Sequence, residues 1–280
     1  MVNLGILLAI LGMLILSVSK LTARKALSSG RVFTIAAYIH VLMVSTIGVL
    51  TLLFGNFALP PNIPYYLLTV VIGAVAIVPL YIAYQQQGLG LPTAIASAFV
   101  PITVLLSVLF YGERFSGIVW VGMVLVLIGV FLASTDLRNW RNPKIHAGLK
   151  WAFITMLGWG VYFFMIKRLI NDMGTWPATF ALETGIAALV LLFAITRKAI
   201  VPLSRSRFSW TAVTGVLDGV GVLCYYASLQ FITASVAATV LQVSVVVCAG
   251  LAALFLKERF TSLQKIAILV TFVGLVLVTV

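Results

Sequence analysis

One long segment of this chain occurs twice. Residues 81–115 recur as residues 226–260, displaced by 145 positions without a gap, and each copy is apolar and ends in Glu-Arg-Phe. Self-similarity at so long a period indicates a duplicated domain rather than a solenoid. Doubled helical bundles in membranes are typical of transporters. The repeat therefore predicts a duplicated membrane protein, and an odd number of spans in each copy would invert the second copy.

The composition places this chain in a bilayer. Hydrophobic residues make up 62% and charged residues 9%, with a mean hydropathy of +1.19, which leaves too little polar surface for a soluble protein of 30.2 kDa. About 20 apolar residues are needed to cross the hydrocarbon core. Ten such runs are expected, at about 3–21, 32–54, 65–87, 91–111, 117–135, 148–167, 176–196, 209–231, 234–256 and 262–280. We predict an all-α integral membrane protein of ten helices, divided into two inverted five-helix repeats, 1–139 and 140–280.

The positions of the basic residues predict the orientation. The net charge is +12, but fifteen of the 18 Lys and Arg lie in or beside odd-numbered connections between the expected spans. Under the positive-inside rule those connections are cytoplasmic and both termini are non-cytoplasmic, in a cell (inner) membrane. Equivalent connections also carry opposite bias, since residues 55–64 are uncharged and residues 197–207 are basic. The charge thus indicates topology and no nucleic-acid partner.

Catalytic and metal-binding patterns are missing from the sequence. It contains no His-Glu-x-x-His and no Gly-x-Ser-x-Gly, and its two histidines, His40 and His146, lie in different regions. Cys224 and Cys248 fall inside expected spans, with no metal-ligand spacing. We expect no enzyme, no metal site and no cofactor. Since a nucleotide-binding motif is also missing, direct ATP drive is not expected.

Several short motifs carry a family resemblance. They are Leu-Gly-Trp-Gly at residues 157–160, a lysine late in the first span of each half (Lys20 and Lys167), Ala-Ser-Val-Ala-Ala at residues 234–238, and the two Glu-Arg-Phe turns. With these motifs the chain resembles the drug/metabolite transporter superfamily, in particular its ten-helix exporters built from two EamA domains, over nearly its whole length. The first half departs from the pattern because it lacks Gly-Trp-Gly. The resemblance implies export of amino acids or other small metabolites and leaves the metabolite open.

Two carboxyl groups and one imidazole lie near the middle of expected spans. Glu183 and Asp218 are near the middle of the seventh and eighth spans, and His40 is in the second. Burial of such groups costs a few kcal/mol each unless they are paired or hydrated, so they are functional candidates. A medium of low dielectric favours a carboxyl group that binds and releases a proton. We hypothesise that Glu183 or Asp218 couples substrate movement to protons; alternatively they satisfy neighbours such as Lys20 or Lys167, or face a water-filled cavity passively.

A tyrosine–glutamine pair also repeats. Tyr81 with Gln85, and Tyr226 with Gln230, lie one helical turn apart on a single face, near the ends of spans three and eight. In inverted copies those ends lie on opposite sides of the membrane. The pairs are therefore candidate inner and outer gates, or else interfacial anchors. The charged pairs Glu113-Arg114 and Glu258-Arg259 are interpreted as exposed anchors with local ion pairs.

Aromatic residues guide the prediction of the substrate. The resemblance places four of them on helices around a central cavity, where they would form an apolar wall: Trp159, Tyr162, Tyr84 and Tyr225. Tyr81, Gln242, Ser97 and His40 could hydrogen-bond the charged ends of an amino acid. Amino acids with aromatic or bulky apolar side chains are the favoured substrates, carried by alternating access.

Other transport functions stay open from the sequence. A passive facilitator or channel would need no coupling residue. Carriers of nucleotide sugars or phosphate esters would require basic residues facing the cavity, and only Lys20 and Lys167 are near enough. Lys20 in the first span disfavours a small-multidrug-type antiporter, while a translocator of lipid precursors is conceivable. The expected partners are a small-molecule substrate and the lipid bilayer, and a monomer is the expected state.

Overall fold

The computed structural model describes residues 2–29, 31–111, 116–134, 148–232, 237, 240–241 and 243–277. Within these ranges the chain forms helices and turns, without a strand. The apolar runs become helices because in hydrocarbon a helix satisfies its backbone N–H and C=O groups within its own segment.

The helices follow the expected spans in order. The first half contains α1 (Val2–Ala26), η1 (Leu27–Ser29), α2 (Val32–Phe54), α3 (Ile63–Gln87), α4 (Gly90–Ser97), α5 (Val100–Tyr111) and α6 (Gly117–Ser134). The second half contains α7 (Leu149–Met173), α8 (Thr175–Thr196), α9 (Arg205–Ser228), α11 (Ser244–Phe255) and α12 (Ser262–Leu277). The all-α fold is confirmed.

The predicted spans match these helices with one division. In the described part of the chain, 7 helical segments are long and apolar enough to cross a membrane, one of which, Gly90–Phe110, contains α4 and most of α5. Three shorter apolar helices lie at further predicted spans: Gly117–Gly129, Ser244–Phe255 and Ser262–Gly274. The fourth predicted span is split into α4 and α5 by a turn at Ala98 and Phe99. Pro101 follows this turn in the first turn of α5, where its missing N–H costs little. Pro79, by contrast, lies inside an unbroken α3.

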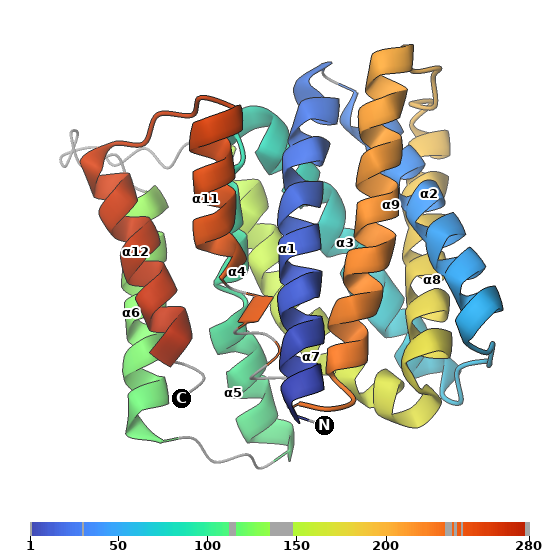
Figure 1. Ribbon diagram of the computed structural model, residues 1–280, viewed down its shortest axis with the longest axis horizontal. Coiled ribbons are helices and arrows are strands. Elements are labelled where there is room, and N and C mark those ends of the chain that lie inside the picture. Colours follow the sequence, from blue (N-terminus) through green and yellow to red (C-terminus); the bar gives the residue numbers. More distant parts are fainter. Residues whose placement is uncertain are drawn as a thin grey trace.

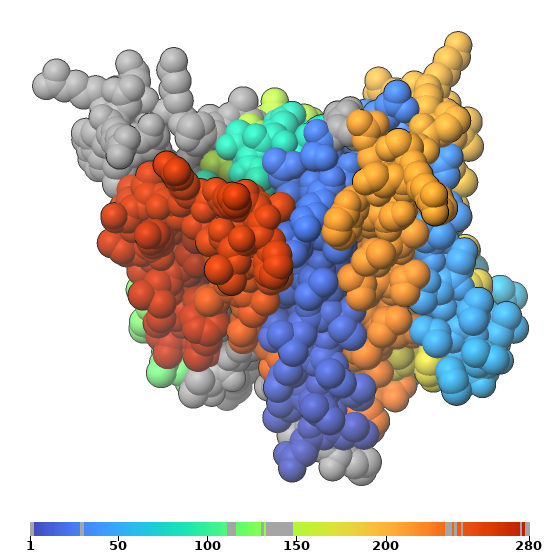
Figure 2. Space-filling model, turned by 45° about the horizontal axis from the view of Figure 1, so that its top comes forward, coloured from blue at the N-terminus to red at the C-terminus, as the bar shows by residue number. Residues whose placement is uncertain are grey.

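Each half packs mainly against the other half. Helix α1 packs along α9, and α3 packs along α7; α2 packs along α8, and α6 along α12 (Figure 1). Figure 2 shows α1 at the surface between α9 and α11. If the halves are exchanged, the α1–α9 pair becomes the α7–α3 pair, so the pattern of contacts is repeated. The inversion of the second half stays a prediction.

Small residues bring helices of different halves close together. A Cβ on Gly12 of α1 would lie 3.0 Å from the Gly221 carbonyl oxygen of α9. A Cβ on Gly274 of α12 would lie 2.7 Å from the Gly122 carbonyl oxygen of α6. Small residues at such crossings allow backbones to approach and to gain van der Waals contact. Gly122 and Gly274 therefore allow α6 and α12 to pack closely.

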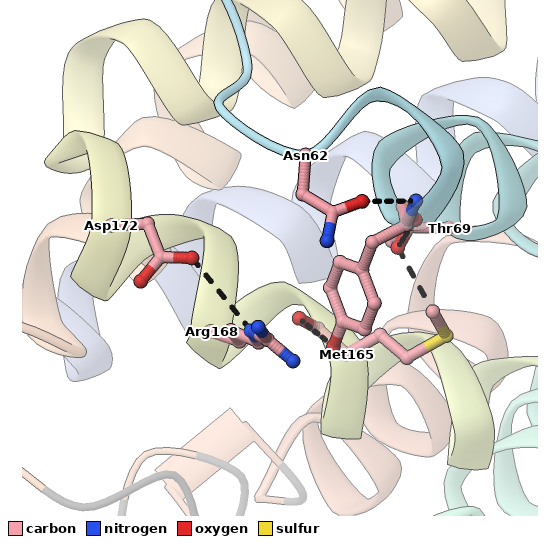
Figure 3. Close-up of polar contacts among 6 residues, drawn as sticks. Asn62, Thr69, Met165, Arg168 and Asp172 are labelled. Atoms are coloured by element: carbon pink, nitrogen blue, oxygen red, sulfur yellow. Dashed lines mark hydrogen bonds and ion pairs between the residues drawn. The ribbon is translucent and has the colours of Figure 1, made fainter.

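Polar contacts fix the start of α3 against α7 (Figure 3). The Asn62 side chain caps α3 by accepting a hydrogen bond from the Tyr65 backbone N–H at 3.0 Å. The Tyr65 hydroxyl donates to the Met165 carbonyl oxygen at 3.0 Å, and the Thr69 hydroxyl donates to the Met165 sulfur at 3.9 Å. These bonds hold the two halves together at one end of the bundle.

Candidate functional site

A cavity of about 130 Å³ lies among helices of both halves. Its walls come from α1, α2, α3, α4 and the turn after it, α7, α8, α9 and α11. Nine of the twelve residues that the sequence singles out as site candidates line it: His40, Tyr81, Tyr84, Trp159, Tyr162, Glu183, Asp218, Tyr225 and Tyr226. Ser97 lines it as well. Gln85 and Gln230 are not among the lining residues, and Gln242 lies outside the described residues.

Glu183 is held by two tyrosine hydroxyls. It projects from α8, and its Oε1 accepts hydrogen bonds from Tyr162 of α7 at 3.3 Å and Tyr226 of α9 at 3.1 Å. The two hydroxyls lie 2.7 Å from each other. Helix α9 lies near α8 in the same half, so this cluster belongs to the second half alone. Charge-assisted bonds of this kind are the usual condition under which a carboxylate persists in a low-dielectric interior.

Asp218 joins the two halves. It projects from α9, and its Oδ1 accepts a hydrogen bond from Ser19 of α1 at 2.5 Å. The next residue, Lys20, donates from Nζ to the Ser244 hydroxyl of α11 at 3.3 Å and is close enough to act electrostatically on Asp218. Asp218 in turn acts on Glu183. The described part of the cavity wall therefore contains two carboxylates and one ammonium group.

Rings form the apolar part of the wall. Phe99, in the turn after α4, stacks on Phe163 of α7 with centroids 4.5 Å apart. Trp159 and Tyr225 meet Phe163 edge to face, at 6.0 and 5.7 Å. Rings arranged in this way leave faces and edges for a further apolar or aromatic group. The cavity thus combines a charged region with an aromatic one.

His40 and two tyrosines complete the wall. His40 Nδ1 lies 2.8 Å from the Ala36 carbonyl oxygen of its own helix, and its ring meets Tyr81 edge to face at 6.0 Å. Tyr81 lies within electrostatic range of both Asp218 and Glu183. The Tyr84 hydroxyl accepts a hydrogen bond from Thr93 of α4 at 3.3 Å. These groups offer a substrate one imidazole nitrogen and two phenol oxygens.

In each repeated tyrosine–glutamine pair, the tyrosine faces the cavity and the glutamine does not. Tyr81 and Tyr226 are 4% and 2% exposed and face the cavity, which does not suit an interfacial anchor. Gln85 donates instead to the Leu27 carbonyl oxygen at 3.3 Å, and Gln230 is exposed. The pairs therefore do not act as units in this conformation, and the gate role stays a prediction.

The sequence did not single out Ser19, Ser244, Phe99 and Phe163, although each lines the cavity. Ser19 could have been found through Lys20, because a lysine within a span needs polar neighbours and Ser19 directly precedes it. Lys167 lies elsewhere and donates to the Leu229 carbonyl oxygen at 2.5 Å. Among the described residues the one ion pair is Arg168–Asp172, 3.8 Å apart on the outer side of α7 (Figure 3).

Comparison with known proteins identifies the family. A model of the EamA-like transporter family matches residues 3–135 and again residues 146–280. The chain belongs to the EamA-like transporter family. Two family matches in one chain confirm the duplication read from the sequence. Together with the membrane-length helices, they make the chain a multi-pass membrane protein of a transporter family.

Curated relatives add a consistent but general description. The chain is 23% identical over 208 residues to a Bacillus subtilis protein named uncharacterized transporter YxxF, covering 71% of this chain and 64% of that one. It is 26% identical over 183 residues to an uncharacterized protein of Haemophilus influenzae, covering 62% of this chain and 60% of that one. The matched regions thus span somewhat under two thirds of these relatives.

A solved structure shares the fold over nearly the whole chain. It is titled only as the crystal structure of a protein, and superposes with a TM-score of 0.73 at 17% identity, covering 98% of this chain and 96% of the other. At this identity the likeness concerns the fold alone.

Proposed function

We propose that this EamA-family protein is a secondary transporter that exports amino acids, with aromatic or bulky apolar side chains favoured. The observation that carries the proposal is the cavity, which places two carboxylates, one ammonium group and a cluster of rings within one set of walls. The proposed location is the cell (inner) membrane, with both termini on the non-cytoplasmic side.

The charged groups suit a zwitterion. Glu183 and Asp218 offer oxygens to the ammonium of an amino acid, while Lys20 and the Ser244 hydroxyl suit its carboxylate. The side chain would lie against Phe99, Phe163 and Trp159. Because the carboxylates outnumber the ammonium groups in the described wall, the site favours a ligand that brings a positive charge.

The size of the cavity favours a small ligand. A cavity of about 130 Å³ is close to the ~150 Å³ that admits benzene into a protein interior, so in this conformation it matches the ring of an aromatic side chain, and a whole amino acid would require the cavity to open further. A nucleotide sugar would require a much larger space and more cationic groups, and Lys20 is the one lysine or arginine in the described wall. These observations support the proposal of amino acids over nucleotide sugars, phosphate esters and lipid precursors.

The arrangement of the helices supports alternating access as the proposed mechanism. Cavity walls come from both halves, and the principal helix contacts cross between the halves. Rocking of one half against the other would expose the same site to each side in turn, as expected for inverted repeats. Because Asp218 accepts a hydrogen bond from Ser19 across this interface, such a movement would change that hydrogen bond.

Proton coupling is proposed for the two carboxylates. Glu183 accepts hydrogen bonds from two hydroxyl groups and Asp218 accepts one, and Asp218 acts electrostatically on Glu183. Protonation of one would weaken its hold on a bound ammonium group and release the substrate. A pH gradient would then drive export.

The test is counterflow of radiolabelled phenylalanine into liposomes that contain the purified protein, with unlabelled amino acids as competitors. Competition by tryptophan and leucine, together with a response to a pH gradient, is expected. Failure of any amino acid to support counterflow, with folded protein, would overturn the proposed substrate class.

A passive facilitator is the second candidate. The hydrogen bonds already made to Glu183 by Tyr162 and Tyr226 favour it, because a satisfied carboxylate need not titrate. Counterflow without any effect of a pH gradient would support this function instead.

A further inference from the structure

A glutamate of the second half completes a helix of the first. Glu258 follows α11, and its Oε1 accepts a hydrogen bond from the Leu89 N–H at 2.7 Å while its Oε2 accepts one from the Gly90 N–H at 3.2 Å. Both amides lie at the start of α4. The predicted local ion pair with Arg259 is therefore not what engages Glu258. Its carboxylate binds backbone amides 168 and 169 residues away.

This contact satisfies a requirement that α4 does not meet itself. The first N–H groups of a helix have no partner within the helix, and a negative charge is favoured there. The residue that caps α4, Leu89, makes no side-chain cap hydrogen bond. Every residue of α4 is buried, so water is a poor substitute. The start of α4 thus depends on a carboxylate from the other half.

Phe260, the third residue of the Glu-Arg-Phe motif, packs beside Glu258, the first residue of that motif. A Cβ at Gly90 would lie 2.5 Å from Phe260 Cζ and 3.6 Å from Glu258 Oε2. Gly88, with φ of +82°, makes the turn that leads into α4. The glycines therefore leave space in which Glu258 and Phe260 dock together.

The helix that Glu258 caps, α4, forms part of the cavity wall. Helix α4 is only 8 residues long, and its end carries Ser97, followed by Phe99; both line the cavity. Helix α4 also packs against α7 and α11. Movement at its start would move Ser97 and Phe99, because a short helix behaves as a rigid body.

A second position that could bind the Glu258 carboxylate lies nearby, beside Arg24 and Lys25. Glu258 lines a separate surface pocket together with Arg24 and Lys25 of α1. Lys25 is engaged over the Trp210 ring at 4.5 Å. Arg24 has a buried Nε without a hydrogen-bond partner among the described residues. Arg24 is therefore the cation that would receive Glu258 if it left the amides.

We propose that Glu258 is the latch of a gate: bound to the Leu89 and Gly90 amides it closes the cavity at this end of the bundle, and moved to Arg24 it holds this end open. The latch rests on the proposed alternating access but on no particular substrate. Under the proposed topology it works on the cytoplasmic side. A static cap, in contrast, would stay on α4 throughout.

The experiment measures access to the cavity without a substrate. Ser97→Cys, in a chain that also carries Cys224→Ser and Cys248→Ser, is labelled with a membrane-impermeant maleimide in right-side-out and in inside-out vesicles. Glu258→Gln is expected to raise the labelling rate about tenfold from one face only, because the closed state loses two charge-assisted hydrogen bonds while the open state loses one partly exposed partner, Arg24. Gly90→Ala should act in the same direction by displacing Phe260. Arg24→Gln should lower the rate from that face, because the open state loses its partner.

The matched control is Arg259→Gln, which removes an exposed charge beside the latch and should leave the rate unchanged. Monodisperse elution in detergent serves as the test of folding; if Glu258→Gln misfolds, Gly90→Ala and Arg24→Gln still decide. Equal labelling of folded Glu258→Gln and the parent, or Arg24→Gln changing the rate in the same direction as Glu258→Gln, would overturn the latch. Since no amino acid is used, a wrong substrate leaves this result unaffected.

Discussion

The two copies of the repeated segment contain the same residues in different surroundings. Tyr81 of α3 lies beside the His40 ring, whereas Tyr226 of α9 donates to Glu183 and contacts the Tyr162 hydroxyl. Both tyrosines face the cavity. Duplication thus placed equivalent side chains at one site, and substitutions on the neighbouring helices then gave only one of them a carboxylate.

The connections after these helices differ in sequence. The first copy continues with Gly88, Leu89 and Gly90, which receive Glu258 and Phe260. The second copy has Thr233, Ala234 and Ser235 at the corresponding positions, which lie outside the described residues. The two glycines that admit Glu258 and Phe260 are therefore specific to the first copy.

The largest effect is expected at Glu183, the carboxylate that distinguishes the two tyrosines. Glu183→Gln should lower phenylalanine counterflow about a hundredfold, because a neutral amide cannot hold an ammonium group in a low-dielectric site. Initial rates in proteoliposomes provide the measurement. Glu183→Asp, which keeps the charge, is the control and should retain part of the rate. Unchanged transport by the glutamine variant would remove Glu183 from the site.

The tyrosines themselves test the comparison directly. Tyr226→Phe removes a hydrogen bond to a charged group, worth roughly 1.5–3 kcal/mol, and should reduce counterflow about tenfold. Tyr81→Phe removes a hydroxyl that makes no such bond to the described residues, and should reduce counterflow about twofold or less. Both changes keep the ring and hence the packing. Equal losses in the two variants would show that the repeats are equivalent during the cycle.

A smaller effect is expected at Ser19, which bonds Asp218 across the halves. Ser19→Ala should slow counterflow about fivefold and change its dependence on a pH gradient, because Asp218 loses its donor. Rates with and without the gradient make the measurement. Ser45→Ala, on the exposed side of α2, is the matched control. A lower rate with an unaltered pH response would indicate a positioning role without coupling.

The smallest effect concerns the two glutamines. Gln85→Ala should destabilise the folded protein by about 1 kcal/mol, since its amide bonds the Leu27 carbonyl oxygen. Gln230→Ala, at an exposed position, should change stability by less than about 0.5 kcal/mol. Thermal unfolding in detergent, followed by loss of the monodisperse peak, would compare them. A larger loss for Gln230 would contradict the assignment of their environments.

Several cavity residues could be predicted from the sequence because the chain lies in a lipid bilayer. In hydrocarbon a carboxylate or imidazole is conspicuous, so Glu183, Asp218 and His40 stood out, and each lines the cavity. Serines and phenylalanines gave no such signal, since both are common in spans. Ser19 and Phe163 were therefore missed, and the gate role of Gln85, whose amide bonds η1, stays a prediction.

The sequence by itself determined the solvent, the helical class, the duplication and the spans, because hydropathy and repetition are properties of the chain taken in order. The tertiary structure alone decided that the fourth span is split into α4 and α5, that Ser19 meets Asp218, and that Glu258 caps α4. These outcomes depend on how each helix is rotated and how deeply it packs against the other half. Hydropathy does not specify that rotation, since the surrounding lipid is as apolar as the side chains that pack against it.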